Sequence, residues 1–415
     1  MAARLLALLA FLGLFAVVFE ITARVEDLVR FGTPLFSPYT SQTDLIVQDE
    51  FGARGRPNAR FQKWVLNSVG TRGPEVAPSK APGVVRVVTA GASETFGLYE
   101  TPSREYPRQL EDSLSAALTR LSCVSSQRPQ RAEVVNAALP GMSLPTVTLD
   151  VKHRIATLQP DFVVYYPTPA QYLDELPPGS VPPRVQSTPE APVLTRALYP
   201  RSWNRLRSQL KAMLPSVAQT WVRQREVKTI LRSRPAGWQF TSVPNDRVEL
   251  FDRDLRRMVG TMRATGAVPI LATNSNAFLG SDPSGVDVLY AWERFTPRAT
   301  GQVILAFDSV GRDIIRQIGR DSAVAIAEVD TAVRGRAAFA DFLHFTDAGA
   351  AAVAGVMSNT IAGEIQRTRC AAAGIARTGV PVSDRTTADE GAPSCPVGAR
   401  GACMPGTGTS SSRPG

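Results

Sequence analysis

Residues 84–97 read VVRVVTAGASETFG, and the rest of the chain can be interpreted around them. The apolar run over residues 84–90 is typical of a buried strand, and it leads directly into a Gly-Ala-Ser turn before a helix. A serine at such a turn faces the carboxyl edge of a parallel sheet, where the free N–H groups of the following helix favour a developing oxyanion. Ser93 is therefore a candidate nucleophile.

A candidate base lies far downstream, in residues 341–346 (DFLHFT). His344 is one of only two histidines in 415 residues, and it follows Asp341 by three positions. A carboxylate can hold an imidazole in one tautomer, so that the other ring nitrogen acts as a general base. The long separation from Ser93 in the chain is no obstacle, because catalytic triads assemble in space.

Other apolar runs alternate with helical patterns along the chain. Strands are predicted at residues 84–90, 133–136, 162–166, 268–273 and 324–330, and helices at residues 106–121, 247–265 and 348–361. Strands separated by helices favour a three-layer α/β/α fold, with a central parallel sheet of about five strands covered on both faces. Ser93, Gly141 and residues 167–171 each follow a strand, so we expect them at the carboxyl edge, where such sheets bind ligands. Thr346 is the predicted N-cap of the last helix.

Three blocks in this order resemble those of the SGNH/GDSL hydrolases. Residues 91–94 (GASE) resemble the first block, which usually reads Gly-Asp-Ser, and residues 136–143 (NAALPGMS) resemble the second, which carries the oxyanion-hole glycine. Residues 341–346, followed by Gly349, are similar to the last block, Asp-x-x-His. Residues 67–75 (NSVGTRGPE) resemble a lead-in common in membrane-anchored bacterial members. The resemblance covers roughly residues 61–365 and implies an SGNH-like (flavodoxin-like) fold.

The resemblance implies an ester hydrolase that acts on an acyl ester of a lipid or an acetylated carbohydrate, with no cofactor. Ser93 would attack the acyl carbonyl, His344 would accept its proton, and Asp341 would orient the imidazole. The N–H groups of Ser93 and Gly141 would hold the oxyanion. Two alternatives remain open: an O-acyltransferase in envelope or exopolysaccharide modification, and an inactive SGNH-like binding module.

The third block departs from the family. A glycine, an asparagine and an aspartate are expected after a strand, with the asparagine donating to the oxyanion, but Pro167 lies about where the asparagine belongs. Proline has no N–H donor, and loss of one oxyanion donor typically lowers turnover by about 10²- to 10³-fold. Thr168, Gln171 and Asn274 are the candidates for a replacement donor. In the first block, Ala92 replaces the usual aspartate, which leaves the nucleophile in place.

The N-terminus predicts the compartment. Residues 5–19 are uninterrupted apolar sequence behind Arg4, and Glu20 ends the run. We interpret residues 1–24 as a transmembrane signal anchor in a bacterial inner membrane, with the catalytic domain facing the periplasm; the alternative is a cleaved signal peptide. An N-terminal extension at residues 25–80 then precedes the hydrolase-like domain at residues 81–365. Residues 366–415 are predicted to form a disordered tail.

An insertion at about residues 175–245 interrupts the pattern of strands. Apolar residues at helical spacing, flanked by arginines, predict either a helical subdomain packed on the core or a lid or basic helix that faces the membrane. The formal net charge of the chain is +9, and we treat this excess as spread along the chain. Because no basic run alternates with aromatic residues, nucleic acid is not an expected partner.

The cysteines fit an oxidising compartment. Cys123, Cys370, Cys395 and Cys403 allow three pairings, and a small loop closed by Cys395 and Cys403 is one possibility. Their spacing, without a Cys-x-x-Cys pair or a nearby histidine, predicts no metal site.

Overall fold

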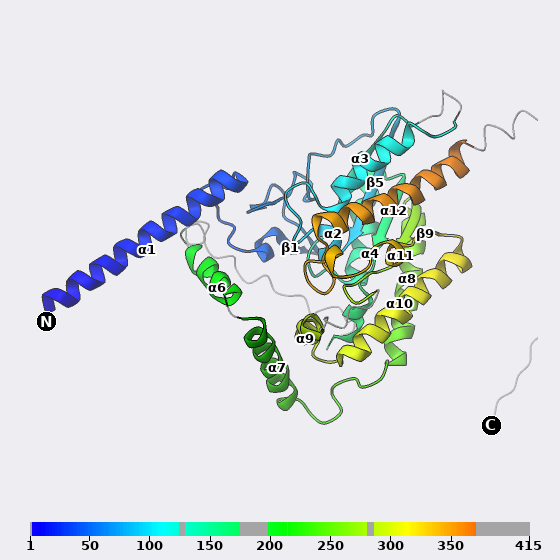
Figure 1. Ribbon diagram of the computed structural model, residues 1–415. Coiled ribbons are helices and arrows are strands. Elements are labelled where there is room, and N and C mark those ends of the chain that lie inside the picture. The colour runs from blue at the N-terminus through cyan, green and yellow to red at the C-terminus, as the bar shows by residue number, and fades with distance from the viewer. Residues whose placement is uncertain are drawn as a thin grey trace, which may run out of the picture.

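A five-stranded, all-parallel sheet forms the centre of the computed structural model (Figure 1), in which residues 2–123, 129–174, 198, 200–213, 215–279 and 286–370 are described. The strand order is β6-β5-β7-β8-β9. The strands are β5 (Val84–Gly91), β6 (Arg131–Asn136), β7 (Phe162–Tyr166), β8 (Val268–Ala272) and β9 (Ala325–Ala327). Every residue of β5 and β7 is buried, as expected for strands covered on both faces of a parallel sheet.

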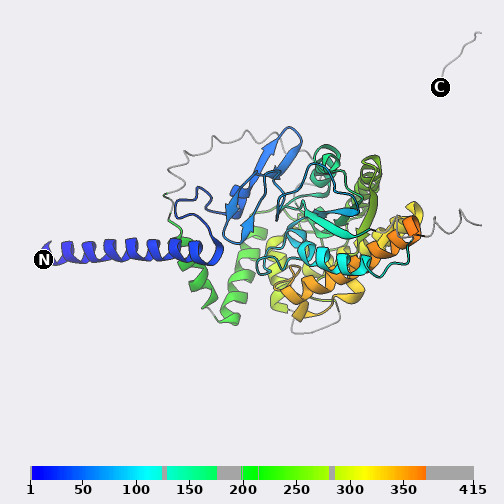
Figure 2. The same ribbon diagram turned by 90° about the horizontal axis from the view of Figure 1, so that it is seen from above.

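Helices cover both faces of this sheet. On one face α3 (Tyr106–Leu118) packs against α12 (Asp347–Ile365), and on the other α8 (Asn245–Ala264) packs against α4 (Leu144–His153) and α10 (Gly301–Ser322) (Figures 1 and 2). Thr346 caps α12, because its hydroxyl accepts the N–H of Gly349 at 3.2 Å. The predicted three-layer α/β/α fold is confirmed.

The remaining elements are short or lie outside the three layers. The N-terminal part contains α1 (Ala2–Phe31), η1 (Gln42–Leu45), β1 (Ile46–Asp49), β2 (Gly52–Gly55), β3 (Arg60–Phe61) and β4 (Trp64–Val65). Further along the chain are α2 (Ser93–Phe96), η3 (Ile155–Leu158), η4 (Pro169–Leu173), α6 (Ser202–Ala212), α7 (Ser216–Arg232), α9 (Val286–Phe295), α11 (Val329–Ala332), η6 (Arg336–Ala338) and η7 (Gln366–Cys370). The helices α6 and α7 belong to the expected insertion, whose residues 175–197, 199 and 214 lie outside the described residues.

One predicted strand is wrong over most of its length. The apolar run at residues 324–330 forms a strand only over Ala325–Ala327, and Val329 begins α11. A polar contact turns the chain here: the Thr273 hydroxyl donates to the Asp330 carboxylate at 2.8 Å and accepts the Asp330 N–H at 3.1 Å. Val329 is fully buried in α11, and a buried apolar residue is equally typical of a strand, so its hydrophobicity could not distinguish strand from helix.

Helices extend past the expected domain bounds at both ends of the chain. The helix α1 includes residues 2–24 of the expected anchor and continues to Phe31 in the N-terminal extension. At the other end, η7 continues the helical chain through Cys370, where a tail from residue 366 was expected. A disulfide joins Cys370 to Cys123 and so attaches the end of α12 to the segment after α3. Cys395, Cys403 and the rest of the expected tail lie outside the described residues.

Candidate active site

Ser93 is the first residue of α2, and one residue separates it from the end of the buried strand β5. The turn that presents it requires a glycine, because a Cβ atom on Gly91 would lie 2.9 Å from the Tyr166 carbonyl oxygen and against the Thr95 side chain. Real Cβ atoms do not approach backbone this closely, so any other residue would displace the turn. The sequence-based prediction of a tight strand-to-helix turn at this point is confirmed.

A chain of hydrogen bonds joins the three predicted triad residues. The Ser93 Oγ atom lies 2.8 Å from Nε2 of His344, and Nδ1 of the same ring lies 2.7 Å from Oδ2 of Asp341. The second carboxylate oxygen of Asp341 accepts the backbone N–H groups of Leu343 and His344, both at 2.9 Å. These bonds fix the orientation of Asp341. The carboxylate in turn favours the imidazole tautomer with its proton on Nδ1, so that the unprotonated Nε2 faces Ser93.

The charges at this site favour an ionised pair. Burial opposes ionisation of Asp341, but hydrogen bonds from His344 and from two backbone N–H groups outweigh it and lower the pKa of the carboxyl group. Burial also opposes protonation of His344, but the hydrogen bond and charge of Asp341, with smaller contributions from Glu94 and Glu100, raise the pKa of the ring. The negative charge of Asp341 therefore favours the protonated form of the His344 ring.

Ser93 and His344 open into a cavity of about 1140 Å³. Gly141, the predicted oxyanion-hole glycine, lines the same cavity; its φ is +78°, and a Cβ atom at this position would meet no atom within 4 Å. The left-handed backbone favours glycine, and Gly141 is exposed. The other walls come largely from α7 and α9.

The three candidates for a third oxyanion donor do not join Ser93 in this cavity. Thr168, Gln171 and Asn274 are not among the described residues that line it. The Thr168 hydroxyl donates instead to Glu94 at 2.8 Å. The side-chain amide of Asn274 is buried, and neither of its polar atoms has a hydrogen-bond partner among the described residues. The structure therefore does not bring any of these three side chains to the cavity that contains Ser93.

Glu94 is a polar group at this site that sequence reasoning missed. Its carboxylate is buried, accepts the Thr168 hydroxyl through one oxygen, and lies 3.2 Å from Ser93 Oγ through the other. The serine hydroxyl has one proton and thus two competing acceptors, Glu94 and Nε2 of His344. The position of Glu94 next to Ser93 in the sequence was the available signal, but that position alone does not reveal which way the Glu94 side chain points.

We expect Glu94→Gln to move the acid limb of the pH profile of kcat/KM to lower pH. The rate falls as His344 becomes protonated, because only the neutral ring accepts the serine proton. Removing the negative charge of Glu94 removes one of the contributions that raise the pKa of His344, so the ring stays neutral at lower pH. Glu111→Gln, which changes a carboxylate bonded to Arg108 and the Val134 N–H, serves as the control. An acid limb that does not move would contradict this role of Glu94.

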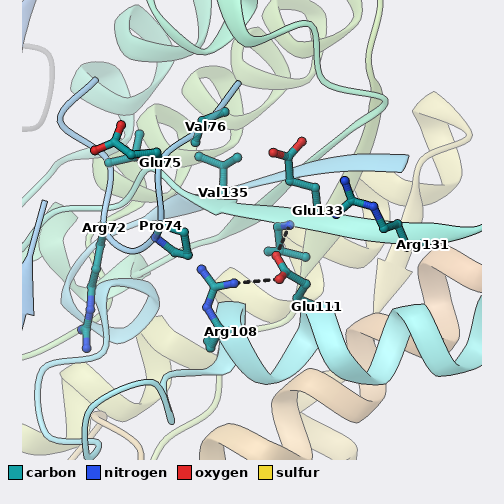
Figure 3. A pocket seen from close by; sticks show the side chains of 11 residues that line it. Arg72, Pro74, Glu75, Val76, Arg108, Glu111, Arg131, Glu133 and Val135 are labelled. Atoms are coloured by element: carbon teal, nitrogen blue, oxygen red, sulfur yellow. Dashed lines mark hydrogen bonds and ion pairs between the residues drawn. The ribbon is translucent and has the colours of Figure 1, made fainter. Parts of the chain in front are cut away.

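A second, smaller cavity lies away from Ser93. It measures about 160 Å³ and is lined by side chains of α3, β6 and residues 71–76 (Figure 3). Several of its charged groups are paired: Arg108 bonds to Glu111 at 2.8 Å, Glu111 also accepts the Val134 N–H at 2.8 Å, and Glu133 accepts a hydrogen bond from Arg86 at 2.7 Å. No group of three or more potential metal ligands occurs among the described residues.

Ser93 after β5, Gly141 after β6 and the Asp341–His344 pair before α12 occupy one edge of a five-stranded parallel sheet. The chain has a three-layer α/β/α fold, with these residues at one edge of its sheet. No family model matches the chain, and no curated protein matches it in sequence. Among solved structures, the chain is similar to a lipase/acylhydrolase from Enterococcus faecalis, with 15% identity, a TM-score of 0.37, and coverage of 68% of this chain and 96% of that one.

Two further solved structures show the same degree of similarity. One is a catalytic mutant of an acetylxylan esterase from Geobacillus stearothermophilus, with 13% identity, a TM-score of 0.37, and coverage of 67% of this chain and 94% of that one. The other is LAE5, an alpha/beta hydrolase from the metagenome of Lake Arreo, with 15% identity, a TM-score of 0.37, and coverage of 69% and 97%. At this level of similarity, the chemistry of the chain has to be interpreted from its own atoms.

Proposed function

We propose that this SGNH-like chain is an ester hydrolase that uses Ser93, His344 and Asp341. Ser93 Oγ attacks the acyl carbonyl while its proton passes to Nε2 of His344, and the carbonyl electrons move onto the oxygen. The N–H groups of Ser93 and Gly141 hold this oxyanion. The imidazolium then returns the proton to the departing alcohol, and the carbonyl re-forms as an acyl ester on Ser93.

The second half of the reaction uses the same groups. His344 takes a proton from a water molecule, the resulting hydroxide attacks the acyl ester, and Ser93 Oγ leaves and recovers its proton from the ring. One observation carries the proposal: a continuous hydrogen-bonded chain from Ser93 through His344 to Asp341 that opens into a cavity. Serine, histidine and aspartate in this arrangement are recognised by geometry rather than by position in the sequence.

The cavity favours an ester with an apolar portion. Leu98, Tyr99, Ile230, Phe295 and Phe342 contribute to its walls, and a volume of about 1140 Å³ admits a ligand much larger than an acetyl group. We therefore expect purified protein to hydrolyse nitrophenyl esters and to prefer medium or long acyl chains over acetate, as measured by kcat/KM along a chain-length series. A preference for acetate would contradict the assignment of an apolar substrate.

Product analysis in the same assay separates hydrolysis from transfer. Acylated sugar that accumulates when free sugars are added would identify an acyltransferase, whereas free acid alone identifies a hydrolase. Folded protein without turnover of any ester would favour the binding-module alternative.

We propose that α1 anchors the catalytic domain on the periplasmic side of a bacterial inner membrane. Within the described chain, α1 is the one helix that is long and apolar enough to cross a membrane. The Cys123–Cys370 disulfide supports an oxidising compartment for the domain. Alkaline phosphatase fused after residue 80 should be active in a bacterial host, because that enzyme folds only where disulfides form. An inactive but well-expressed fusion would place the domain in the cytoplasm.

A further inference from the structure

An exposed apolar line runs along α6 and α7. Its members, referred to below as the α6–α7 line, are Trp203, Leu206, Leu210, Met213, Val217 and Trp221. Spacings of three and four residues place such side chains on one helical face, which in a soluble protein is normally buried. Here Trp203 is 62% exposed, and Met213 and Val217 are each 80% exposed. Exposed apolar surface of this extent on two successive helices indicates a binding partner.

The same segment carries almost all of the net charge of the protein. Residues 201–234 contain nine basic residues and one acidic residue, a net charge of +8 against +9 for the whole chain. The interpretation that the basic excess is spread along the chain is therefore wrong. Arg207, Lys228 and Arg232 are exposed on these helices. An apolar face bordered by basic side chains is the composition of helices that lie in the interface of an anionic bilayer.

Polar contacts fix the start of α6 to α1. The two carboxylate oxygens of Glu20 accept the backbone N–H groups of Arg201 at 3.1 Å and of Ser202 at 2.9 Å. The side chain of Arg201 lies 3.4 Å from the carboxylate of Asp27, and Arg205 pairs with both Asp27 and Glu26. Arg201 and Asp27 are buried, so this attachment is part of the packed structure rather than a loose surface contact.

Glu20 also marks the level at which α1 would leave a membrane. Residues 5–19 are entirely apolar, their side chains are exposed up to Val18, and Glu20 is the first charged residue after them. The helix α6 therefore starts at the boundary between the apolar and the polar part of α1. From there α6 and α7 follow one another across the direction of α1 rather than along it (Figures 1 and 2). This direction is that of a helix lying in the plane of the bilayer surface.

We infer that the α6–α7 line is a second membrane contact, which lies in the interface of a bilayer with anionic headgroups. The inference rests on the proposal that α1 spans the membrane, and it does not depend on catalysis. Trp221, at the end of the α6–α7 line, also lines the cavity that contains Ser93, as do Val222, Thr229 and Ile230 of α7. The contact therefore holds one wall of this cavity at the membrane surface, where an ester carried by a lipid can enter.

Tryptophan fluorescence tests this contact in the full chain. The protein has five tryptophans and none lies in α1; Trp64 and Trp292 are buried, whereas Trp203 and Trp221 belong to the α6–α7 line. The full chain is reconstituted into vesicles that contain phosphatidylglycerol and a phosphatidylcholine whose acyl chains carry bromine. We expect emission to be quenched relative to vesicles without bromine, and we expect this difference to be lost in the Trp203→Phe/Trp221→Phe double variant.

Trp238→Phe is the matched control, because Trp238 lies beyond the end of α7, and it should retain the quenching. Repeating the measurement in the Ser93→Ala background separates this inference from the proposed reaction. With Ser93 retained, the Arg207→Glu variant should show less quenching than the wild-type chain. The wild-type chain should also be quenched less in vesicles that lack phosphatidylglycerol. Absent quenching in the wild-type chain, or quenching that survives the double variant, would overturn the inference. If quenching is absent and the protein extracted from the vesicles is a dimer, a second copy of the chain would be the partner instead.

Discussion

Ser93→Ala and His344→Gln are each expected to lower kcat for ester hydrolysis by about 10⁴- to 10⁶-fold. The alanine variant has no nucleophile, and the glutamine variant has no group at the Nε2 position that can accept the serine proton. Both act on the same step, so the double variant should be about as slow as either single variant. The measurement is the initial rate of hydrolysis of a nitrophenyl ester. The concentration of folded protein is used as the concentration of active sites.

Melting temperatures of the same variants show whether a loss of activity comes from unfolding. Both side chains are small or partly polar, and neither lies in the apolar core, so the melting temperature should change little. A single variant that retains more than a few per cent of turnover would contradict the assignment of that residue. Losses that multiply in the double variant would show that the two residues act in separate steps.

Arg72→Met is expected to destabilise the protein by about 3–5 kcal/mol. The guanidinium of Arg72 is buried, lies 3.1 Å from the Glu105 carboxylate and donates to the carbonyl oxygens of Phe96 and Gly97. Those two carbonyls end α2, the short helix that begins with Ser93. The variant leaves the Glu105 carboxylate buried without its partner, which is the costly part of the change.

Denaturant unfolding of three variants isolates this cost. Arg256→Met removes an arginine that bonds to Asp252 and Asp321 on the exposed surface, and it should cost under about 1 kcal/mol. Arg72→Met combined with Glu105→Met removes both charges and should recover part of the stability lost in the single variant. An Arg72→Met protein as stable as the Arg256→Met protein would show that the buried pair does not support the turn at Ser93.

The positions of the strands along the chain followed from hydrophobic periodicity, because buried parallel strands are continuous apolar runs, whereas the helices α9 and α10 were not predicted. Four of five strands were predicted close to their observed bounds, and Phe162–Tyr166 was predicted at its observed bounds. The exception, at residues 324–330, failed because Val329 is buried whether it belongs to a strand or to α11. Its conformation depends on the contact between Thr273 and Asp330, which are far apart in the sequence.

The positions of Ser93, Gly141, Asp341 and His344 could be predicted because each follows a recognisable local pattern. The role of Glu94 could not, since its contact with Thr168 requires that β5 and β7 be neighbours in the sheet. Apolar runs locate the strands along the chain, but they do not reveal which strands are neighbours in the sheet. The attachment of α6 to Glu20 was equally hidden, because it joins polar groups 181 and 182 residues apart without any periodicity.

The central claim is that Ser93 is the activated nucleophile, and covalent labelling tests it most directly. Wild-type protein is treated with a fluorophosphonate, which reacts with activated serines, and the modified residue is located by mass spectrometry of peptides. We predict a single phosphonylated serine at position 93 and no label in the folded Ser93→Ala variant. A label at another residue that persists in the variant, or unlabelled wild-type protein with an intact fold, would contradict the claim.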